Sequence, residues 1–320
     1  MRGVASDSSI TVANFFRPAV DAPPRASGAV LAGLRILAGL LWLYNVAWKR
    51  PPDFGQDSGN GLYGFTRDAV DHPVFPPYSW LVEHVVLPNF TAFGWSVLVV
   101  ETMLAVLLLT GTLVRLAALV GVGQALAIGL SVAQTPGEWP WAYWMMIGIH
   151  VVLLFTAAGK VAAVDAVRSE SAEGRGGNVA MRLLGGWGIL MGLTGIWALL
   201  LTVGDDPLKS SGPTLGGPEL SVSFGSYNLV GALVLTAVAA LMLAAATMHR
   251  RGLALAATVA AVVAAVSLYA QLSRTDVWLG GSNTSAAFFL CAAVVSGATA
   301  GQLGRSRRHS RVATLAGRDE

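Results

Sequence analysis

The stretch Thr91–Thr110, TAFGWSVLVVETMLAVLLLT, decides the fold class. A helix needs roughly 20 apolar residues to cross a hydrocarbon core about 30 Å thick, and this run has that length. Glu101 is its only charged residue. A run of this length and composition is typical of a transmembrane helix, so the stretch predicts that the chain crosses a membrane.

The rest of the chain has the same character. Of its 320 residues, 54% are hydrophobic and 12% are charged, and the mean hydropathy is +0.60. A soluble domain carries about a quarter charged residues, so these charges are too few to cover a globular surface. We therefore predict an all-α, polytopic membrane protein of about eight transmembrane helices. The predicted spans are 29–48, 91–110, 113–133, 142–162, 183–203, 225–248, 253–271 and 284–302.

The polar segments divide the chain into five parts. We expect a flexible cytoplasmic arm (1–28), a four-helix membrane domain (29–166), a cytoplasmic linker (167–182), a second four-helix membrane domain (183–303) and a basic cytoplasmic tail (304–320). The first domain contains a Pro-rich outer loop, 49–90, which is too long for a simple turn. That loop is expected to lie along the membrane surface or to fold over the helix bundle.

The two membrane domains carry similar local sequences in the same order. Phe93-Gly94 and Phe224-Gly225 open the second and sixth spans, and Ala133-Gln134 and Ala270-Gln271 end the third and seventh. These matches favour a degenerate parallel repeat of four helices each.

Lysine and arginine indicate the orientation. With both termini inside, fifteen of the 21 Lys and Arg fall in inner segments, five fall in outer segments, and Arg35 lies within a span. Cations are retained on the cytoplasmic side, so we predict a multi-pass plasma-membrane protein with both termini cytoplasmic.

Composition also excludes several classes of protein. Cys291 is the only cysteine, which excludes an internal disulfide, a CxxC redox centre, an iron–sulfur cluster and a thiolate zinc site. No metal, haem or flavin motif is found. The pI of about 9.2 accompanies a net charge of only +3, and the bases are not interleaved with aromatic residues, so nucleic acid is not an expected partner. Any redox chemistry would need a bound cofactor or a partner.

Two charges lie inside the predicted spans of the first domain. Arg35 and Glu101 are expected at depths that differ by about 6 Å, within reach of a long Arg side chain. Because buried charges are costly, each needs a partner or a role. They form either a structural ion pair or a charge pair that serves a proton path or an anionic ligand. The spans of the second domain carry no ionisable group in their apolar parts, so we place the chemistry in 30–162.

The outer end of the first span carries a second candidate group: Asn45, Trp48, Lys49 and Arg50. Two adjacent cations on the outer side break the positive-inside preference. They are either a snorkelling Lys beside an interfacial Trp or an anion site.

Three further aromatic or imidazole side chains are candidates. His150 is the only histidine well inside a span, where it is either a hydrogen-bonded core residue or a proton relay or quinone-oxygen contact. Trp141 belongs to an outer aromatic cluster, which is either an interfacial belt or a ligand-stacking platform. His84 lies in the long outer loop.

Residues 30–166 resemble the DoxX/DoxD family, specifically the DoxD-type subunit of thiosulfate:quinone oxidoreductases. The matching residues are Leu34-Arg35-Ile36 with Gly39, Trp48-Lys49, His72 to Trp80, Glu83 to Phe90, Glu101 to Arg115, Pro136 to Trp141, Ala158-Gly159-Lys160 and Val164-Asp165-Ala166.

The resemblance implies a four-helix membrane unit whose activity takes two electrons from thiosulfate to a membrane quinone. It makes Lys49, Arg35 and Glu101 the expected catalytic residues. Lys49 with Arg50 would hold the anion from outside, and the outer aromatic edge would admit a quinone ring. The expected substrate-binding residues are Arg50, Trp48, Asn45, His84, Trp141 and His150.

The leading hypothesis is therefore a quinone-linked oxidoreductase or a subunit of one. The alternative is a non-catalytic membrane scaffold or accessory subunit that docks a redox or respiratory complex through 183–303 or the basic tail. A carrier for a small anion or a lipid ranks third, because no span is interrupted by Gly and Pro in its middle.

Overall fold

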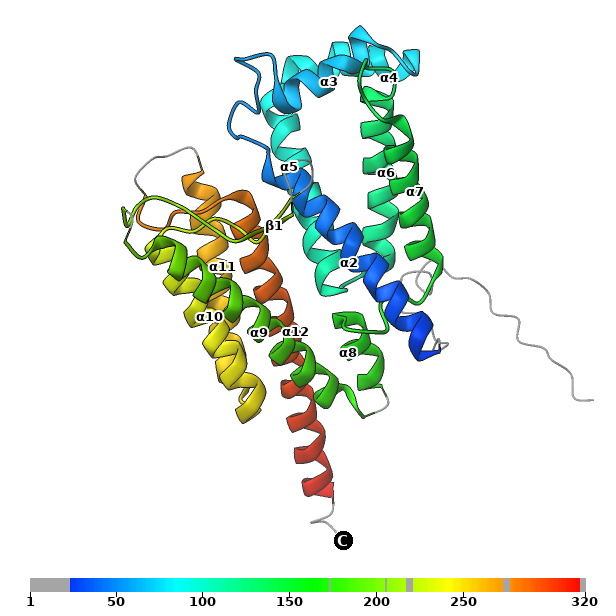
Figure 1. Ribbon diagram of the computed structural model, residues 1–320. Helices are drawn as coiled ribbons and strands as arrows, with labels where there is room; N and C mark the ends of the chain where they lie inside the picture. The colour runs from blue at the N-terminus through cyan, green and yellow to red at the C-terminus, as the bar shows by residue number, and fades with distance from the viewer. Residues whose placement is uncertain (1–23, 173, 205, 217–220, 273–276, 317–320) are drawn as a thin grey trace, which may run out of the picture.

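The computed structural model describes residues 24–172, 174–204, 206–216, 221–272 and 277–316. Within these ranges, seven helices are long and apolar enough to cross a membrane, and an eighth apolar helix is shorter. The predicted class, a helical multi-pass membrane protein, is confirmed. The helices form two units that lie side by side (Figure 1).

The first unit contains α2 (Arg25–Ala47), α5 (Phe90–Thr110), α6 (Val114–Val132) and α7 (Pro140–Phe155). Helix α2 packs against α5, and α6 packs against α7. Gly39 makes the first contact close, since a Cβ at this position would lie 2.8 Å from the side chain of Leu109. Small residues let helix backbones approach in this way, which favours packing in a membrane where water does not drive association.

The second unit contains α9 (Gly176–Thr202), α10 (Leu229–Met248), α11 (Arg251–Gln271) and α12 (Asn283–Ala316). Here α9 packs against α10, and α11 packs against α12. Gly188 meets Leu243 much as Gly39 meets Leu109, with 2.9 Å from its Cβ position to the leucine. The two units thus pair their helices in the same order, which supports the parallel repeat, although the repeat stays a prediction.

Local sequence signals define several helix ends. Gly111 ends α5 with a φ of 66°, a left-handed conformation that glycine adopts at little cost. Pro140 begins α7, where its missing N–H and fixed φ suit the first turn. The side chain of Asn228 caps α10 by accepting a hydrogen bond of 2.9 Å from the Gly231 amide.

The long segment 49–90 folds over the first unit, which is one of the two arrangements predicted for it. It contains α3 (Gly61–Asp71), α4 (Pro76–Leu81), the π-helical turn η1 (Val82–Val86) and the 3-10 turn η2 (Leu87–Asn89). Helix α3 packs against α6. The hydroxyl of Tyr78 donates a 3.1 Å hydrogen bond to the carbonyl of Ala127 on α6. These elements lie across the end of the helix bundle, at the top of Figure 1.

Three helices cross the predicted domain boundaries. Helix α2 begins at Arg25, within the predicted arm, whose residues 1–23 lie outside the described ranges. Helix α8 (Val164–Ser171) runs into the predicted linker, 167–182, which also contains the first turns of α9. Helix α12 continues to Ala316, within the predicted tail. A hydropathy window stops near charged residues, but arginine is a good helix former, so these helices extend past their apolar parts.

The fourth predicted span, 142–162, is also wrong at its end. Helix α7 ends at Phe155, and Thr156 has extended backbone geometry. The residues that follow leave the helix, and three of their carbonyls accept hydrogen bonds from Arg35. Between α9 and α10, residues Thr214–Gly216 (β1) and Ser221–Ser223 (β2) form a short antiparallel pair.

Buried polar contacts join the two units. The side-chain amide of Asn283, at the start of α12, donates to the carbonyls of Val46 (3.1 Å) and Lys49 (2.9 Å) at the end of α2. The hydroxyl of Tyr269 on α11 donates to Thr102 Oγ1 on α5 at 3.1 Å. A helix leaves its last carbonyls without intrahelical partners, so Asn283 completes the end of α2.

We expect Asn283→Ala to destabilise the protein, because the carbonyls of Val46 and Lys49 would each lose a hydrogen bond, and that of Val46 would keep its 3.4 Å bond from the Lys49 amide. The loss is about 2 kcal/mol, from about 1 kcal/mol for each hydrogen bond. Thermal unfolding in mild detergent measures it. Asn89→Ala is the matched control, since the Asn89 amide is exposed and bonds only to Val85 in its own segment. Equal melting temperatures for the two variants would contradict this role of Asn283.

Candidate functional site

A buried ion pair lies in the first unit, between Lys49 and Glu101. The two side chains are 2% and 1% exposed. Lys49 Nζ also donates to the backbone carbonyl of Asn45 at 2.9 Å, and Glu101 Oε1 accepts from Gln124 Nε2 at 3.2 Å. Both charges are therefore paired and hydrogen-bonded, as buried charges must be.

The position of Lys49 follows from where α2 ends. Glu101 lies roughly 16 Å along α5 from Phe90, at 1.5 Å per residue. Since Lys49 reaches it, the end of α2 lies beside the middle of α5. The lysine turns back toward the last carbonyls of α2, which is a favourable position for a cation because the carbonyl end of a helix is partly negative.

Two sequence predictions about these charges are wrong. Glu101 pairs with Lys49 and not with Arg35. Lys49 lies in the interior, whereas Arg50 is exposed, so the two cations do not form one outer anion site. Trp48 covers the lysine, with its ring centroid 4.3 Å from Nζ. Axial positions along the helices do not predict this pairing, because the pairing depends on the tilt of α2 across the bundle (Figure 1).

Arg35 is fully buried and holds the segment that follows α7. Its Nη1 donates to the carbonyls of Ala158 (3.0 Å) and Val161 (3.2 Å), and its Nη2 donates to Ala162 (2.8 Å). Backbone carbonyls that have left a helix need donors in a membrane. Arg35 therefore satisfies them and fixes the path of the chain between α7 and α8.

Asp165 anchors the same segment to α6. Its carboxylate accepts from the amides of Leu113 (3.1 Å) and Val114 (3.0 Å) at the start of that helix. A carboxylate at a helix N-terminus is stabilised by the free amides and by the helix dipole. The backbone amide of Asp165 also donates to the carbonyl of Gly111 at 3.0 Å. Asp165 and Arg35 together lock the end of the first unit that faces α8.

His150 is a buried, hydrogen-bonded core residue. Its Nε2 accepts from the indole N–H of Trp42 at 2.9 Å, and its Nδ1 lies 2.8 Å from the carbonyl of Met146. This pattern requires a neutral imidazole with its proton on Nδ1. Both ring nitrogens are thus engaged, which favours the core reading over a proton relay or a quinone-oxygen contact.

The remaining predicted residues lie at the surface. His84 is exposed and stacks on Trp80, with 5.0 Å between ring centroids. Trp141 is exposed and meets Trp139 edge to face. Exposed tryptophans of this kind are typical of an interfacial aromatic belt. Neither residue touches the Lys49–Glu101 pair.

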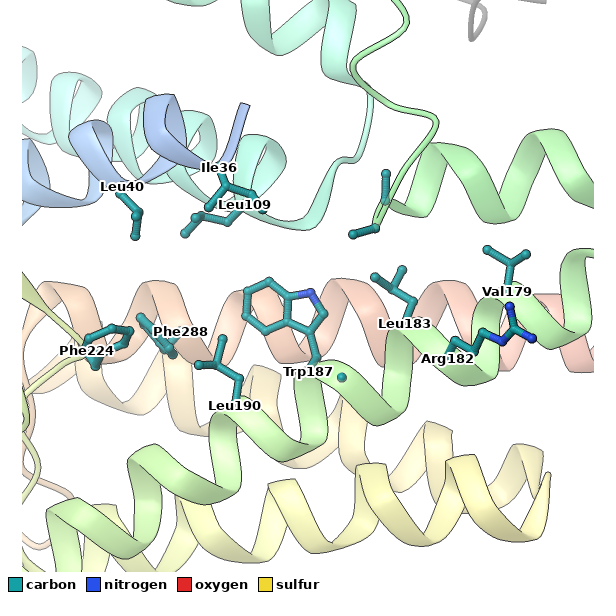
Figure 2. Close-up of a pocket in the computed structure, with 13 residues that line it drawn as sticks. Ile36, Leu40, Leu109, Val179, Arg182, Leu183, Trp187, Leu190, Phe224 and Phe288 are labelled. Carbon is teal, nitrogen blue, oxygen red and sulfur yellow. The ribbon is translucent and has the colours of Figure 1, made fainter. Parts of the chain in front are cut away.

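Sequence reasoning missed a cavity between the two units. It has a volume of about 540 Å³, within the range of small-molecule sites. Figure 2 shows its walls, with Trp187 between an aromatic end and an end that carries Arg182. Among the described residues that line it, Arg182 is the only charged one. The lining residues are Ile36, Leu40, Leu109, Ala162, Ala163, Val179, Arg182, Leu183, Gly186, Trp187, Leu190, Phe224 and Phe288.

The sequence carried a signal for this cavity. Arg182, Gly186 and Trp187 stand close together in the chain, and a helical period places them on neighbouring faces of α9. The predicted linker ended at 182, which separated the arginine from the helix it belongs to.

Comparison with known proteins does not add to this geometry. No family model, no curated protein and no solved structure matches the chain. In the part of the chain that the structure describes, no three or more His, Cys, Asp or Glu residues form a group that could hold a metal ion.

The ion pair makes a prediction about stability. Lys49→Met should cost about 3 kcal/mol, because it leaves the Glu101 carboxylate buried without its cation. Lys49→Met with Glu101→Met should recover most of that loss, since two apolar side chains replace two charges. Thermal unfolding of the single and double variants measures both effects. Arg50→Met is the control and should change little, because Arg50 is exposed. A double variant no more stable than Lys49→Met would refute this account.

A glycine of α6 tests the position of His150. A Cβ at Gly121 would lie 2.1 Å from the imidazole Cδ2, whereas one at Gly123 would meet nothing within 4 Å. Gly121→Ala should displace His150, break its bond with Trp42 and cost about 1–3 kcal/mol. Gly123→Ala should leave the melting temperature unchanged or raise it slightly. A normal melting temperature in Gly121→Ala would show that His150 lies elsewhere.

Proposed function

We propose that this chain is a quinone-binding integral membrane protein of the DoxX/DoxD type, acting as a quinone-linked oxidoreductase or as the membrane subunit of one. The cavity between its two units carries the proposal. It is long, apolar and bordered by helices whose outer faces are themselves apolar, so a ligand dissolved in the bilayer is the natural occupant.

The cavity suits a quinone in three respects. Its volume of about 540 Å³ is that of a site for a ring with a short isoprenoid segment. Trp187 offers a flat face against which a ring can stack. Arg182 offers N–H donors, which a quinone carbonyl can accept. The bound quinone would accept two electrons and two protons to become the quinol.

The residues of the first unit support this site from behind. Ile36, Leu40 and Leu109 form one wall, and Ala162 and Ala163 continue it. Arg35 fixes that continuation through its hydrogen bond to Ala162. In this proposal Arg35, Lys49 and Glu101 are positioning residues, because their polar atoms serve the protein and not a ligand.

The donor follows from the resemblance alone. We propose an electron donor of the thiosulfate type. The protein lies in the plasma membrane in this proposal, with both of its termini on the cytoplasmic side. Lys49 does not offer it an accessible outer site, because the lysine is buried and paired. A partner subunit that carries the donor site fits the same geometry.

Filling the cavity tests the proposal. Gly186 lines it, and a Cβ there would meet nothing within 4 Å, so Gly186→Phe should place a ring in the cavity without strain. We expect the affinity for a short-chain quinone analogue to fall at least tenfold, as measured by calorimetry with purified protein in lipid nanodiscs. Gly148→Phe is the matched control, since Gly148 is exposed on α7 and equally unobstructed.

The outcomes separate the two leading hypotheses. Binding that is lost in Gly186→Phe and kept in Gly148→Phe supports the quinone site, and thiosulfate-dependent reduction would add the donor. No quinone binding by folded wild-type protein would refute the proposal, and the membrane scaffold would then be the leading hypothesis.

A further inference from the structure

We infer that Arg182 holds the headgroup of the cavity's occupant. The redox ring then lies near the N-terminal end of α9, and the isoprenoid tail points toward Phe224 and Phe288. This inference rests on the proposed quinone function and adds a binding residue and an orientation. In the predicted topology, the ring then lies toward the cytoplasmic side, opposite to the outer anion site expected from the sequence.

The cavity has two chemically different ends. Arg182 lies at one end with Val179 and Leu183, whereas Phe224 and Phe288 lie at the other (Figure 2). Along α9, the lining runs from Val179 to Leu190, which spans about 16 Å at 1.5 Å per residue. Its occupant is therefore an elongated apolar molecule with a hydrogen-bond acceptor at one end only.

Arg182 has donors available for such an acceptor. Within the described ranges its side chain makes no hydrogen bond and no ion pair. No acidic residue belongs to the described lining, so no carboxylate competes for the guanidinium. In this respect Arg182 differs from Arg35, whose two terminal nitrogens are bonded to backbone carbonyls.

Charge also distinguishes the Arg182 end. Arg182 is the only charged residue of the described lining, whereas Arg35 is not part of that lining and its terminal nitrogens are bonded to backbone carbonyls. An electron-rich headgroup is favoured there, and an apolar tail is favoured between the phenylalanines.

Two headgroups share this acceptor chemistry, a quinone carbonyl and the anionic headgroup of a lipid or fatty acid. Trp187 favours the quinone, because it places an aromatic face within about two helical turns of Arg182. The experiment therefore includes oleate and an anionic phospholipid as competitors of the quinone analogue.

Photolabelling tests the orientation in the full-length protein in nanodiscs. An analogue with an azide on the quinone ring should attach to residues 179–187, and one with the azide at the tail end should attach near Phe224 or Phe288. The reverse pattern would overturn the orientation while leaving the quinone site intact. Absence of attachment by either probe to any lining residue would refute the proposed function itself.

Arg182→Gln tests the headgroup contact. Affinity for the quinone analogue should fall about tenfold, the effect of losing one hydrogen bond from a charged donor, and Arg182→Lys should retain part of it. Arg250→Gln is the matched control, because Arg250 is exposed at the start of α11, outside the lining. Unchanged affinity in Arg182→Gln would overturn the inference. Displacement of the analogue by equimolar oleate or anionic phospholipid would also overturn it, in favour of an anionic lipid site.

Discussion

The ion pair between Lys49 and Glu101 constrains the rest of the structure. Each charge is stable in the membrane interior only while the other lies beside it, so the end of α2 must stay at one depth against α5. Gln124 adds α6 to this arrangement through its bond to Glu101. Two residues of the same helix, Ile36 and Leu40, line the cavity between the two units.

The class of fold could be predicted from sequence because the bilayer imposes a simple rule on length and apolar composition. The sequence also predicted that Glu101 has a partner, since a carboxylate in an apolar run needs one. The partner was predicted wrongly, because axial positions along the helices favoured Arg35, whereas the structure brings Lys49 from the end of α2 to Glu101. The early end of α7 escaped prediction for a similar reason. Thr156 is the only polar residue in its sequence between His150 and Gly159, and the carbonyls that leave the helix accept hydrogen bonds from a guanidinium of another helix.

The cavity was beyond sequence reasoning for a different reason. Its lining comes from several elements far apart in the chain, and most of its residues are ordinary apolar side chains that any span contains. Arg182 was the exception, but hydropathy placed it in a linker. His150 shows the opposite case, in which a conspicuous residue turns out to be saturated by Trp42 and Met146. Residue type alone thus indicated which polar side chains are buried, but not whether their hydrogen-bonding groups are already engaged within the protein.

Asn283 has a consequence for how the protein is made. A membrane protein is inserted helix by helix as synthesis proceeds, so α2 enters the bilayer long before α12 exists. Until α12 arrives, the carbonyls of Val46 and Lys49 lack the donor that they have in the finished protein. The last span of the chain is therefore what completes the first.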